Sequence, residues 1–541
     1  MAFSRPAISK SSDNPPAPPV LRGKATGKPR VPGIPYRAIT DSPLFYSLAF
    51  ALSPVGTLRR IPQGRRPGSA SAGHGVYDVE ILYDVHDPHA GMGGSRQPRR
   101  ENGTLSRRST TVEEREGILQ HTVSASREPG SRRWDRSIAQ PARHLASDIG
   151  PRPPGSKGEN RAARYVLREL EKLGFQAEVQ DFRTPLTTAW AKALDRLLVI
   201  AGVLLFPVNG HLSYALLAAG FLAFLLERYG RSPFFWMAPS GRSTNVLVRV
   251  PPAREPEARL VLMAHLDSHW SAFYYRPGLV SLYRPFRAAD TASHGLLFIL
   301  FTLAYGGRLL GMDSSKLSFL WRVGLAITSL PFLSMLALFA KALSGRASPG
   351  GNHNGSGVAL LLELARNYSR HRPHGAELWF AFTGASEANG RGARVLLRRH
   401  RRELRGAYFL VLEGVGRGFP ACVVKEGPFP GFHADRRFLR LARRIIDSYA
   451  HYSGGLTSNR LYPGEAFHLL SRGHRAMTVT GREDTSIPRF WRWERDDQAN
   501  VDPRNLRLAL DFVRALVDAV DHGGLQRRGL AVREPGKGPS R

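Results

Sequence analysis

Two periods of hydrophobic residues alternate along the second half of the chain. Apolar positions at helical spacing predict helices, and short apolar runs bounded by turn residues predict strands. We expect helices at residues 163–173, 357–366, 394–404, 435–449 and 503–520, and strands at 175–182, 377–383, 407–412 and 475–480. Strands that alternate with helices are typical of an α/β fold with a doubly wound, mostly parallel sheet flanked by helices.

A long apolar block interrupts this alternation. Residues 197–226 contain no formally charged side chain, and Pro207 breaks the block near its middle. One continuous helix of this length would measure about 45 Å, more than a hydrocarbon core of roughly 30 Å requires. The break therefore favours a transmembrane helical hairpin at residues 190–230, with Lys192 and Arg196 snorkelling from its first arm.

A second apolar block predicts another transmembrane hairpin, at residues 288–343. Its arms are 291–307, which includes His294, and 323–340, which holds 18 uncharged residues. Four arms in two hairpins exceed what one soluble core needs, so we expect a multi-pass membrane protein in contact with the lipid bilayer. Buried core helices of a large soluble domain are the alternative. Basic residues flank the hairpins on both sides, which leaves the orientation of the α/β domain open.

The segment 1–140 shows no sustained helical or strand period. Pro, Gly, Ser and Arg dominate it, and such a composition cannot bury enough apolar surface to fold alone. The whole chain of 541 residues carries a formal net charge of +33. This charge suits nucleic acid or an anionic surface, but no nucleic-acid fold signature accompanies it, so we expect a disordered basic arm. A start codon downstream of the arm is a further hypothesis, which peptides from before residue 130 in a mass spectrum would contradict.

The two hairpins divide the α/β domain into three stretches. We expect this domain at residues 141–189, 231–287 and 344–525, followed by a disordered tail at 526–541. The single cysteine, Cys422, excludes an intramolecular disulfide and a cysteine-based zinc knuckle. It stands in an apolar run that predicts a buried strand, so we expect a core residue rather than a nucleophile.

Histidine and glutamate side chains mark the ends of several predicted elements. His265, Glu387 and Glu413 each follow an apolar run, and His353 lies in a Gly/Asn/Ser turn before a predicted helix. Open α/β sheets bind ligands outside the carboxyl ends of their strands. We therefore expect these side chains to gather at one edge of the sheet as a candidate metal site. A polar pocket that holds a hydrogen-bonded pair of His265 and Asp267 is the alternative.

Five short motifs occur in the order found in one known family. They are Arg152 to Ser156, Thr244 to Val248, Ala264 to Ser268, Asn352 to Ala359, and Thr383 to Glu387. With matching strands and helices between them, they resemble the co-catalytic zinc aminopeptidases and carboxypeptidases of metallopeptidase family 28. The resemblance covers residues 142–525 apart from the apolar insertions. It implies a zinc-aminopeptidase-like fold, a peptide substrate, and two zinc ions with a glutamate as general base.

Three residues match the site that this resemblance implies. His265 corresponds to the first histidine ligand of the family, and Asp267 to the carboxylate that orients that histidine. Glu387 corresponds to the second glutamate of a pair, which is a zinc ligand. The resemblance therefore assigns metal ligation to His265 and Glu387, and a supporting role to Asp267.

The chain departs from the family pattern at four places. His353 stands in place of the bridging aspartate, Ser386 in place of the general-base glutamate, and Glu413 in place of a shorter aspartate ligand. The last histidine ligand is expected within residues 489–496, which contain no histidine. A neutral imidazole has one lone pair and cannot bridge two cations. We therefore expect one zinc ion rather than two, held by His265, His353 and Glu413.

These departures lead to three hypotheses about function. Ser386 cannot serve as a base near neutral pH, so the first is a membrane-anchored zinc-peptidase-like protein that is catalytically weak or inactive. The second is an active single-zinc peptide hydrolase, with Glu387 as the base once it is free of a second metal. The third is nucleic-acid or anionic-surface binding through the basic arm, which predicts a steep dependence on salt.

Overall fold

The computed structural model describes residues 137–428, 431–448, 455–483 and 487–525. The predicted arm lies outside these residues except for its last few positions, as does the predicted tail, so both stay predictions. The described strands form one nine-stranded sheet: β1 (Glu178–Pro185), β2 (Ser240–Val250), β3 (Ala258–His265), β4 (Ala376–Thr383), β5 (Tyr408–Leu412), β6 (Phe419–Glu426), β7 (Phe432–His433), β8 (Gly455–Asn459) and β9 (Arg475–Arg482).

The centre of the sheet is parallel, and the strands on both sides join it through antiparallel pairs. The strand order is β1-β2-β4-β3-β5-β9-β6-β7, with β8 paired to β6. Strands β4, β3, β5 and β9 run parallel to one another, whereas β2 joins β4 and β6 joins β9 in the antiparallel sense. The predicted α/β fold with a helix-flanked sheet is therefore confirmed, and the sheet is mixed. The carboxyl ends of the parallel strands meet at one edge, where the candidate site residues lie.

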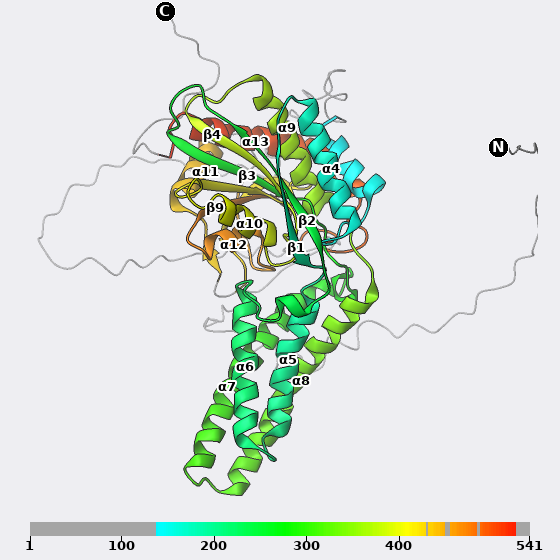
Figure 1. Ribbon diagram of the computed structural model, residues 1–541, viewed down its shortest axis with the longest axis vertical. Helices are drawn as coiled ribbons and strands as arrows, with labels where there is room; N and C mark the ends of the chain where they lie inside the picture. Colours follow the sequence, from blue (N-terminus) through cyan, green and yellow to red (C-terminus); the bar gives the residue numbers. More distant parts are fainter. Residues whose placement is uncertain (1–136, 429–430, 449–454, 484–486, 526–541) are drawn as a thin grey trace, which may run out of the picture. The chain divides into compact units, whose positions relative to one another are not determined.

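The helices of this domain cover both faces of the sheet (Figure 1). Their bounds are α4 (Lys157–Lys172), α9 (Ser356–Arg370), α10 (Arg391–Arg399), α11 (Arg436–Ser448), α12 (Glu465–Leu470) and α13 (Pro503–Asp521). Helices α4, α9, α11 and α13 contribute to one hydrophobic cluster, and α10 and α12 to another. The predicted buried strand around Cys422 is confirmed as part of β6.

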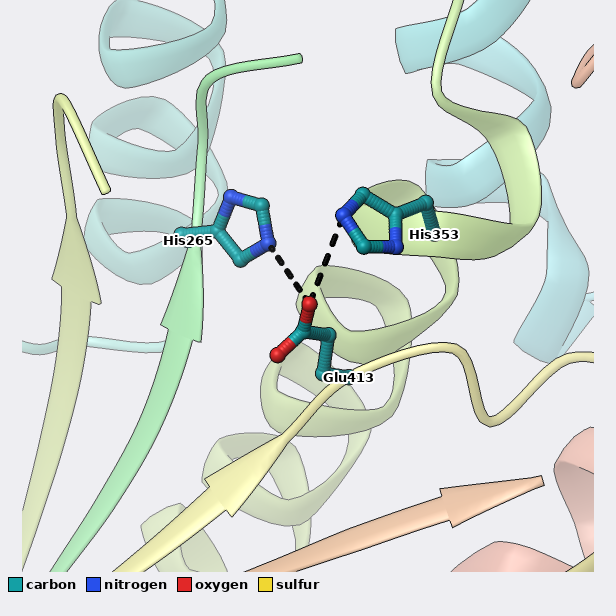
Figure 2. Close-up of side chains that lie close together, drawn as sticks. All are labelled: His265, His353 and Glu413. Atoms are coloured by element: carbon teal, nitrogen blue, oxygen red, sulfur yellow. Dashed lines mark ion pairs between the residues drawn. The ribbon is translucent and has the colours of Figure 1, made fainter. Parts of the chain in front are cut away.

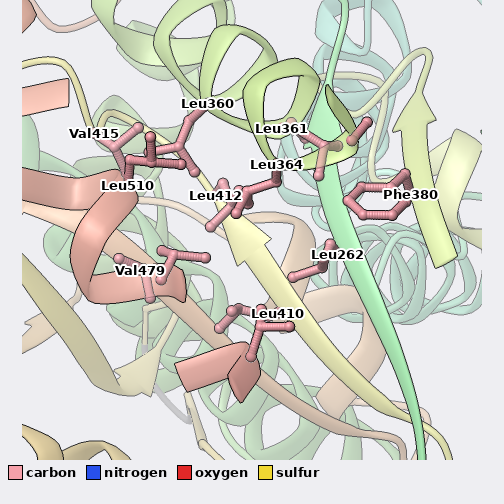
Figure 3. Packing of buried hydrophobic residues seen from close by; sticks show 14 of the residues in the cluster. Leu262, Leu360, Leu361, Leu364, Phe380, Leu410, Leu412, Val415, Val479 and Leu510 are labelled. Atoms are coloured by element: carbon pink, nitrogen blue, oxygen red, sulfur yellow. The ribbon is translucent and has the colours of Figure 1, made fainter. Parts of the chain in front are cut away.

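Alternating side chains of the central strands supply the two clusters. In β3, Leu260 and Leu262 belong to the first cluster, and Val261 and Met263 belong to the second. Figure 3 shows Leu262 among leucines of α9 and neighbouring strands. Because successive strand residues point to opposite faces, a shift of one residue would exchange the two sets, so this packing fixes the register. The fixed register in turn determines which residue stands at the end of each strand.

Two predicted elements differ in extent from the structure. The strand expected at 175–182 is β1, which pairs from Glu178↔Leu247 to Pro185↔Ser240. Its register is set by β2, which is far away in sequence, so local pattern alone placed it about three residues early. The basic helix expected at 394–404 is the shorter α10, because residues 400–406 turn toward β5.

Four further helices pack as a bundle (Figure 1). They are α5 (Ala189–Leu205), α6 (Gly210–Arg228), α7 (Tyr283–Leu309) and α8 (Ser314–Ser344). The break predicted at Pro207 is confirmed by the turn between α5 and α6. By length and composition, three helices of the described chain could cross a membrane: Gly210–Arg228, Val280–Leu309 and Ser314–Ser344. Helix α5, with 17 residues, is shorter than these.

The bundle exposes large apolar side chains on its outside. Its exposed members are Trp190, Leu197, Leu204, Leu212, Leu222, Leu225, Leu296, Ile299, Leu303, Leu309, Phe319, Phe332, Leu333, Leu336 and Leu343. Soluble proteins rarely expose apolar surface of this extent, and such patches mark contacts with membranes or partners.

The bundle interior contains an ion-pair cluster near the α/β domain. Arg196 is 5% exposed and pairs with Asp195 and Asp290, with 2.7 Å between the nearest atoms in each pair, while its Nε donates to Ser334. The snorkelling predicted for Arg196 is therefore wrong. Two carboxylates inside the bundle satisfy its guanidinium, which removes the reason to reach outward. Lys192 likewise turns toward Glu227, at 3.7 Å.

A buried arginine joins the start of the domain to the site edge. Arg152 is fully buried, and its guanidinium donates to the carbonyl oxygens of Leu145, Gly150, Leu266 and Gly350. These acceptors lie on separate segments, including the residue after β3 and the turn before α9. Arg152 therefore ties the lead-in segment to the loops that carry the candidate ligands.

We predict that Arg152→Met lowers the free energy of unfolding by about 3 kcal/mol or more. The substitution keeps an apolar stem but leaves several buried carbonyl oxygens without donors, and each such loss costs about 1–3 kcal/mol. Chemical denaturation of the purified protein measures the change. Arg164→Met, at an exposed position of α4, is the matched control and should shift stability by about 0.5 kcal/mol or less. Equal effects of the two substitutions would contradict this account.

Candidate metal centre

Three predicted ligands meet at the carboxyl edge of the sheet. His265 is the last residue of β3, Glu413 directly follows β5, and His353 lies in the turn Gly351–Gly355 before α9. All three side chains are buried, and one possible ligand atom from each lies within 4.8 Å of the others. Figure 2 shows both imidazoles directed at the Glu413 carboxylate. The structure thus brings together the set that the sequence suggested for a single ion.

The spacing of these atoms is close to what a zinc ion requires. Tetrahedral zinc with ligands at about 2.1 Å holds its ligand atoms about 3.4 Å apart. The distance from His353 Nε2 to Glu413 Oε1 is 3.3 Å, and from His265 Nε2 to the same oxygen 4.0 Å. Two imidazoles and one carboxylate are a known donor set for a catalytic zinc with an open fourth position. The residues therefore fit one zinc ion.

Asp267 prepares His265 for ligation. The Nδ1 of His265 lies 2.9 Å from the Asp267 carbonyl oxygen and 3.4 Å from its carboxylate, so Nδ1 carries the proton and Nε2 is left as the ligand atom. Burial alone would lower the pKa of His265, but the carboxylates of Asp267, Glu413 and Glu387 outweigh it and raise the pKa to about 10. In the metal-free protein this field favours the doubly protonated ring at neutral pH, so a metal ion at Nε2 would take the place of a proton.

The same Asp267 carboxylate holds the turn that carries Glu387. It accepts hydrogen bonds from the backbone N–H groups of Ser386 at 2.9 Å and Glu387 at 2.8 Å. The N–H of Ala385 donates to Glu159, and Ala385 has a positive φ of 50°, which is costly for a residue with a Cβ. The turn is strained but held from two sides, so Glu387 has a defined position.

Glu387 lies beside the three-ligand cluster rather than in it. Its Oε1 is 3.0 Å from His353 Nε2, and its Oε2 is 2.7 Å from both His269 Nδ1 and Arg492. Burial would raise the pKa of Glu387, but Arg492, His269 and His353 outweigh it and hold this pKa well below its usual range. Glu387 is therefore an ionised carboxylate at neutral pH, anchored by a guanidinium.

Arg492 lies in the segment 489–496, where the family resemblance places a histidine ligand. It is buried, and both Phe490 and Arg492 have positive φ values, of 58° and 59°. The backbone strain is offset by the ion pair with Glu387 and by packing of the guanidinium over the Tyr462 ring, 4.6 Å from its centroid. A guanidinium thus supplies positive charge beside the glutamate expected to ligate a second zinc.

Four contributors to the site received no role from the sequence. Arg492 contacts Glu387, Tyr462 donates to Glu413 Oε1 at 2.5 Å, and His269 links Glu387 to Lys341 Nζ, which is 2.8 Å from its ring. Two of them had a signal in the sequence, because Arg492 lies in the segment expected to hold a ligand and His269 lies beside the His265 motif, where it could line a pocket. Tyr462 and Lys341 reach the site from parts of the chain that carry no local motif, so only the fold reveals them.

The predicted site residues therefore fall into two groups. His265, His353 and Glu413 form the cluster, and Asp267 supports it through His265. Ser386 contributes its backbone N–H to Asp267 and lines a neighbouring cavity together with Glu387. The expectation that Glu387 ligates a metal is not tested by its placement beside the cluster.

Part of the chain is similar to a known protein family. Residues 337–517 match the profile described as peptidase family M28, a stretch that includes His353, Glu387 and Glu413 but begins after His265. The match supports the metallopeptidase family and a zinc-peptidase-like function for the α/β domain. Among curated proteins, none matches the chain.

Solved structures with a similar chain path include enzymes of two kinds. A glutaminyl cyclase from Bacteroides thetaiotaomicron is 14% identical, with a TM-score of 0.41, over 71% of this chain and 97% of that one. The zinc aminopeptidase BSAP from Bacillus subtilis is 14% identical, with a TM-score of 0.42, over 71% and 94%. An aminopeptidase from Aneurinibacillus sp. strain AM-1 is 15% identical, with a TM-score of 0.40, over 75% and 97%. Likenesses of this size leave the fold to be argued from the strands and helices themselves.

We predict that Arg492→Met lowers the stability of the metal-free protein by about 3–5 kcal/mol at neutral pH, because it leaves the Glu387 carboxylate buried without its cation. Arg489→Met, at an exposed position nearby, is the control. The difference between wild type and Arg492→Met should shrink as the pH falls below about 4.5. Glu387 has a depressed pKa when folded, so its stabilisation is present above the unfolded pKa and is lost as the pH falls through the folded pKa. Denaturation curves across this pH range measure both effects, and a pH-independent difference would contradict them.

Proposed function

We propose that the protein is a membrane-anchored, zinc-peptidase-like protein that holds one zinc ion on His265, His353 and Glu413. The observation that carries the proposal is the buried cluster of these three side chains at the carboxyl edge of the sheet. The contact of His265 Nδ1 with Asp267 leaves Nε2 to face the cluster, and the surrounding carboxylates favour a cation there, either a proton or a metal ion in its place. The family match supports the same class of site.

The contacts of Glu387 support one ion rather than two. A second zinc beside the first would need Glu387 and a bridging carboxylate as ligands. Glu387 is instead paired with Arg492, and the bridging place carries His353, whose Nε2 lone pair serves one ion. Guanidinium and zinc would compete for the same carboxylate, so we infer that Arg492 takes over the charge of a second metal.

The surroundings of the cluster favour slow chemistry. A zinc ion bound there would supply Lewis acidity and lower the pKa of a coordinated water. Ser386, at the place of the general base, has a hydroxyl that does not accept protons near neutral pH. Glu387 is held by Arg492 and His269, and its low pKa makes it a weak base. We therefore propose a protein of low or absent peptidase activity, with ligand binding as its main property.

An active single-zinc peptide hydrolase is the second candidate, favoured by one distance. Glu387 Oε1 lies 3.0 Å from His353 Nε2, so it can accept a hydrogen bond from a water molecule at the cluster. In this version Glu387 Oε1 receives the proton of the attacking water, and Arg492 and His269 hold the carboxylate in place. The two candidates share the zinc site and differ only in turnover.

We predict about one zinc ion per chain in protein purified without chelator, as measured by elemental analysis. His265→Ala should reduce the content to near zero, whereas His371→Ala, at an exposed histidine of the same domain, should leave it unchanged. Chelation should lower the unfolding temperature of the wild type and not that of His265→Ala. Binding at a hundredfold excess over Kd contributes about 2.7 kcal/mol. A wild-type protein that never acquires zinc would defeat the proposal.

Turnover of peptide substrates distinguishes the two candidates on the same samples. Zinc-loaded protein without turnover supports the binding protein. Turnover that disappears in Glu387→Gln while zinc stays bound supports the hydrolase, because the amide keeps the shape of the carboxylate and cannot take a proton. Turnover that persists in both Glu387→Gln and His265→Ala would exclude this centre as its source.

Membrane anchoring is proposed from the bundle. Helices α6, α7 and α8 are long and apolar enough to cross a bilayer, and apolar side chains cover the outside of the bundle. We predict that the full chain stays in the membrane fraction after an alkaline carbonate wash, because release would expose this apolar surface to water. Detergent should extract the chain from the same membranes, which is the positive control. Release by carbonate alone would contradict the proposed anchoring.

A further inference from the structure

A cavity of about 430 Å³ lies between the candidate metal centre and the four bundle helices. Glu387, Ser386 and Arg492 line it on the side of the sheet, and residues of α5, α6, α7 and α8 line it on the side of the bundle. Its volume is within the range of sites that bind small molecules. The cavity therefore lies beside the centre, next to Glu387, and the bundle helices form its other side.

One wall of this cavity is apolar and reaches the outside of the bundle. Leu333 and Ala337 of α8 line it one helical turn apart, and Leu282 lines it just before α7. Leu282 is 60% exposed and Leu333 is 52% exposed, so both stand at the rim. If the bundle lies in a membrane as proposed, this rim opens toward the hydrocarbon region or its edge rather than toward bulk water.

Positive charge exceeds negative charge around the cavity. Six lysines and arginines line it against four carboxylates. Arg196 is neutralised by Asp195 and Asp290, whereas the Lys341 ammonium donates to a histidine ring, His269 Nε2, at 2.8 Å. Lys341 is buried, and none of the described residues places a carboxylate within ion-pair distance of its Nζ. Burial disfavours the charged form of such a side chain, so an anion bound beside Nζ would stabilise the ammonium form. The excess charge therefore fits an anionic occupant.

A buried histidine gives an independent sign of a missing ligand. His468 lines the cavity, is 2% exposed, and neither of its ring nitrogens has a hydrogen-bond partner among the described residues. Buried polar groups in folded proteins are almost always paired, so the unpaired ring leaves a place at this wall for a polar partner, either water or a polar group of a ligand.

We propose that this cavity binds an amphipathic anion with an acyl chain, of which an N-acyl amino acid is representative. The acyl chain lies along Leu333 and Ala337, and the anionic end binds Lys341. Eight residues of helix separate Leu333 from Lys341, about 12 Å, which suits a chain of medium length. The proposal rests on the proposed function in one respect, since access through the leucine rim requires the bundle to lie in a membrane.

Photolabelling of the full chain in lipid nanodiscs tests this proposal. The probe is N-dodecanoylglycine with a photoreactive group in its chain, and labelled peptides are identified by mass spectrometry. We expect saturable labelling near Leu282 and Leu333. Unlabelled N-dodecanoylglycine should compete about tenfold or more better than dodecanol, which lacks the charge, or N-acetylglycine, which lacks the chain.

Three variants test whether the cavity and the charge of Lys341 are needed for binding. Ala337→Trp fills the cavity and Lys341→Met removes the charge, and each should weaken competition about tenfold or more. Leu336→Trp adds the same ring to an exposed position of α8 outside the cavity and should leave binding unchanged. Equal competition by N-acetylglycine would point to a water-soluble anion, equal competition by dodecanol to a plain lipid, and either result overturns the proposal.

Zinc content, measured on the same samples, separates this proposal from the proposed function. Saturable labelling of protein that holds no zinc would contradict the proposed zinc site and support ligand binding in the cavity. Zinc-loaded, membrane-bound protein without saturable labelling would contradict ligand binding in the cavity and support the proposed zinc site.

Discussion

Charge balance among buried carboxylates is the constraint on which the site depends. Asp267, Glu387 and Glu413 lie close together at the carboxyl edge of the sheet, and their side chains have little exposure to water. The negative charge of each carboxylate is stabilised in a different way. Asp267 accepts two backbone N–H groups, Glu387 pairs with Arg492, and Glu413 faces two imidazoles and a tyrosine hydroxyl. Only the last arrangement leaves room for a cation from outside the chain.

This division explains why the site holds together with so few of the ligands that the family resemblance implies. A guanidinium is permanently charged and presents several donors in a plane, so it can neutralise Glu387 without metal. It offers no Lewis acidity, however, and cannot activate water. Replacing a metal with Arg492 therefore preserves electrostatic stability while giving up chemistry, which is the pattern we propose for this protein.

Much of the fold was predictable because its signals are local. The helical periods of α9 and α13, the break at Pro207 and the strand ends at His265 and Glu413 were all visible in the sequence. Residues of the site were predictable only where they belong to a recognisable sequence motif. Arg492 and Tyr462 act through contacts with residues far away in sequence, and Arg196 is satisfied by carboxylates of the bundle itself. Pairings of this kind depend on packing, which a single sequence does not reveal.

The order of elements along the chain has a consequence for assembly. His265 ends β3, and the turn with His353 begins only after the whole α7/α8 hairpin has been passed. Strands β3 and β4 are parallel neighbours in the sheet although the same hairpin separates them. The two histidines can therefore meet only when both ends of this insertion lie side by side at the sheet. Pairing of β3 with β4 and assembly of the cluster thus depend on one and the same closure of the chain.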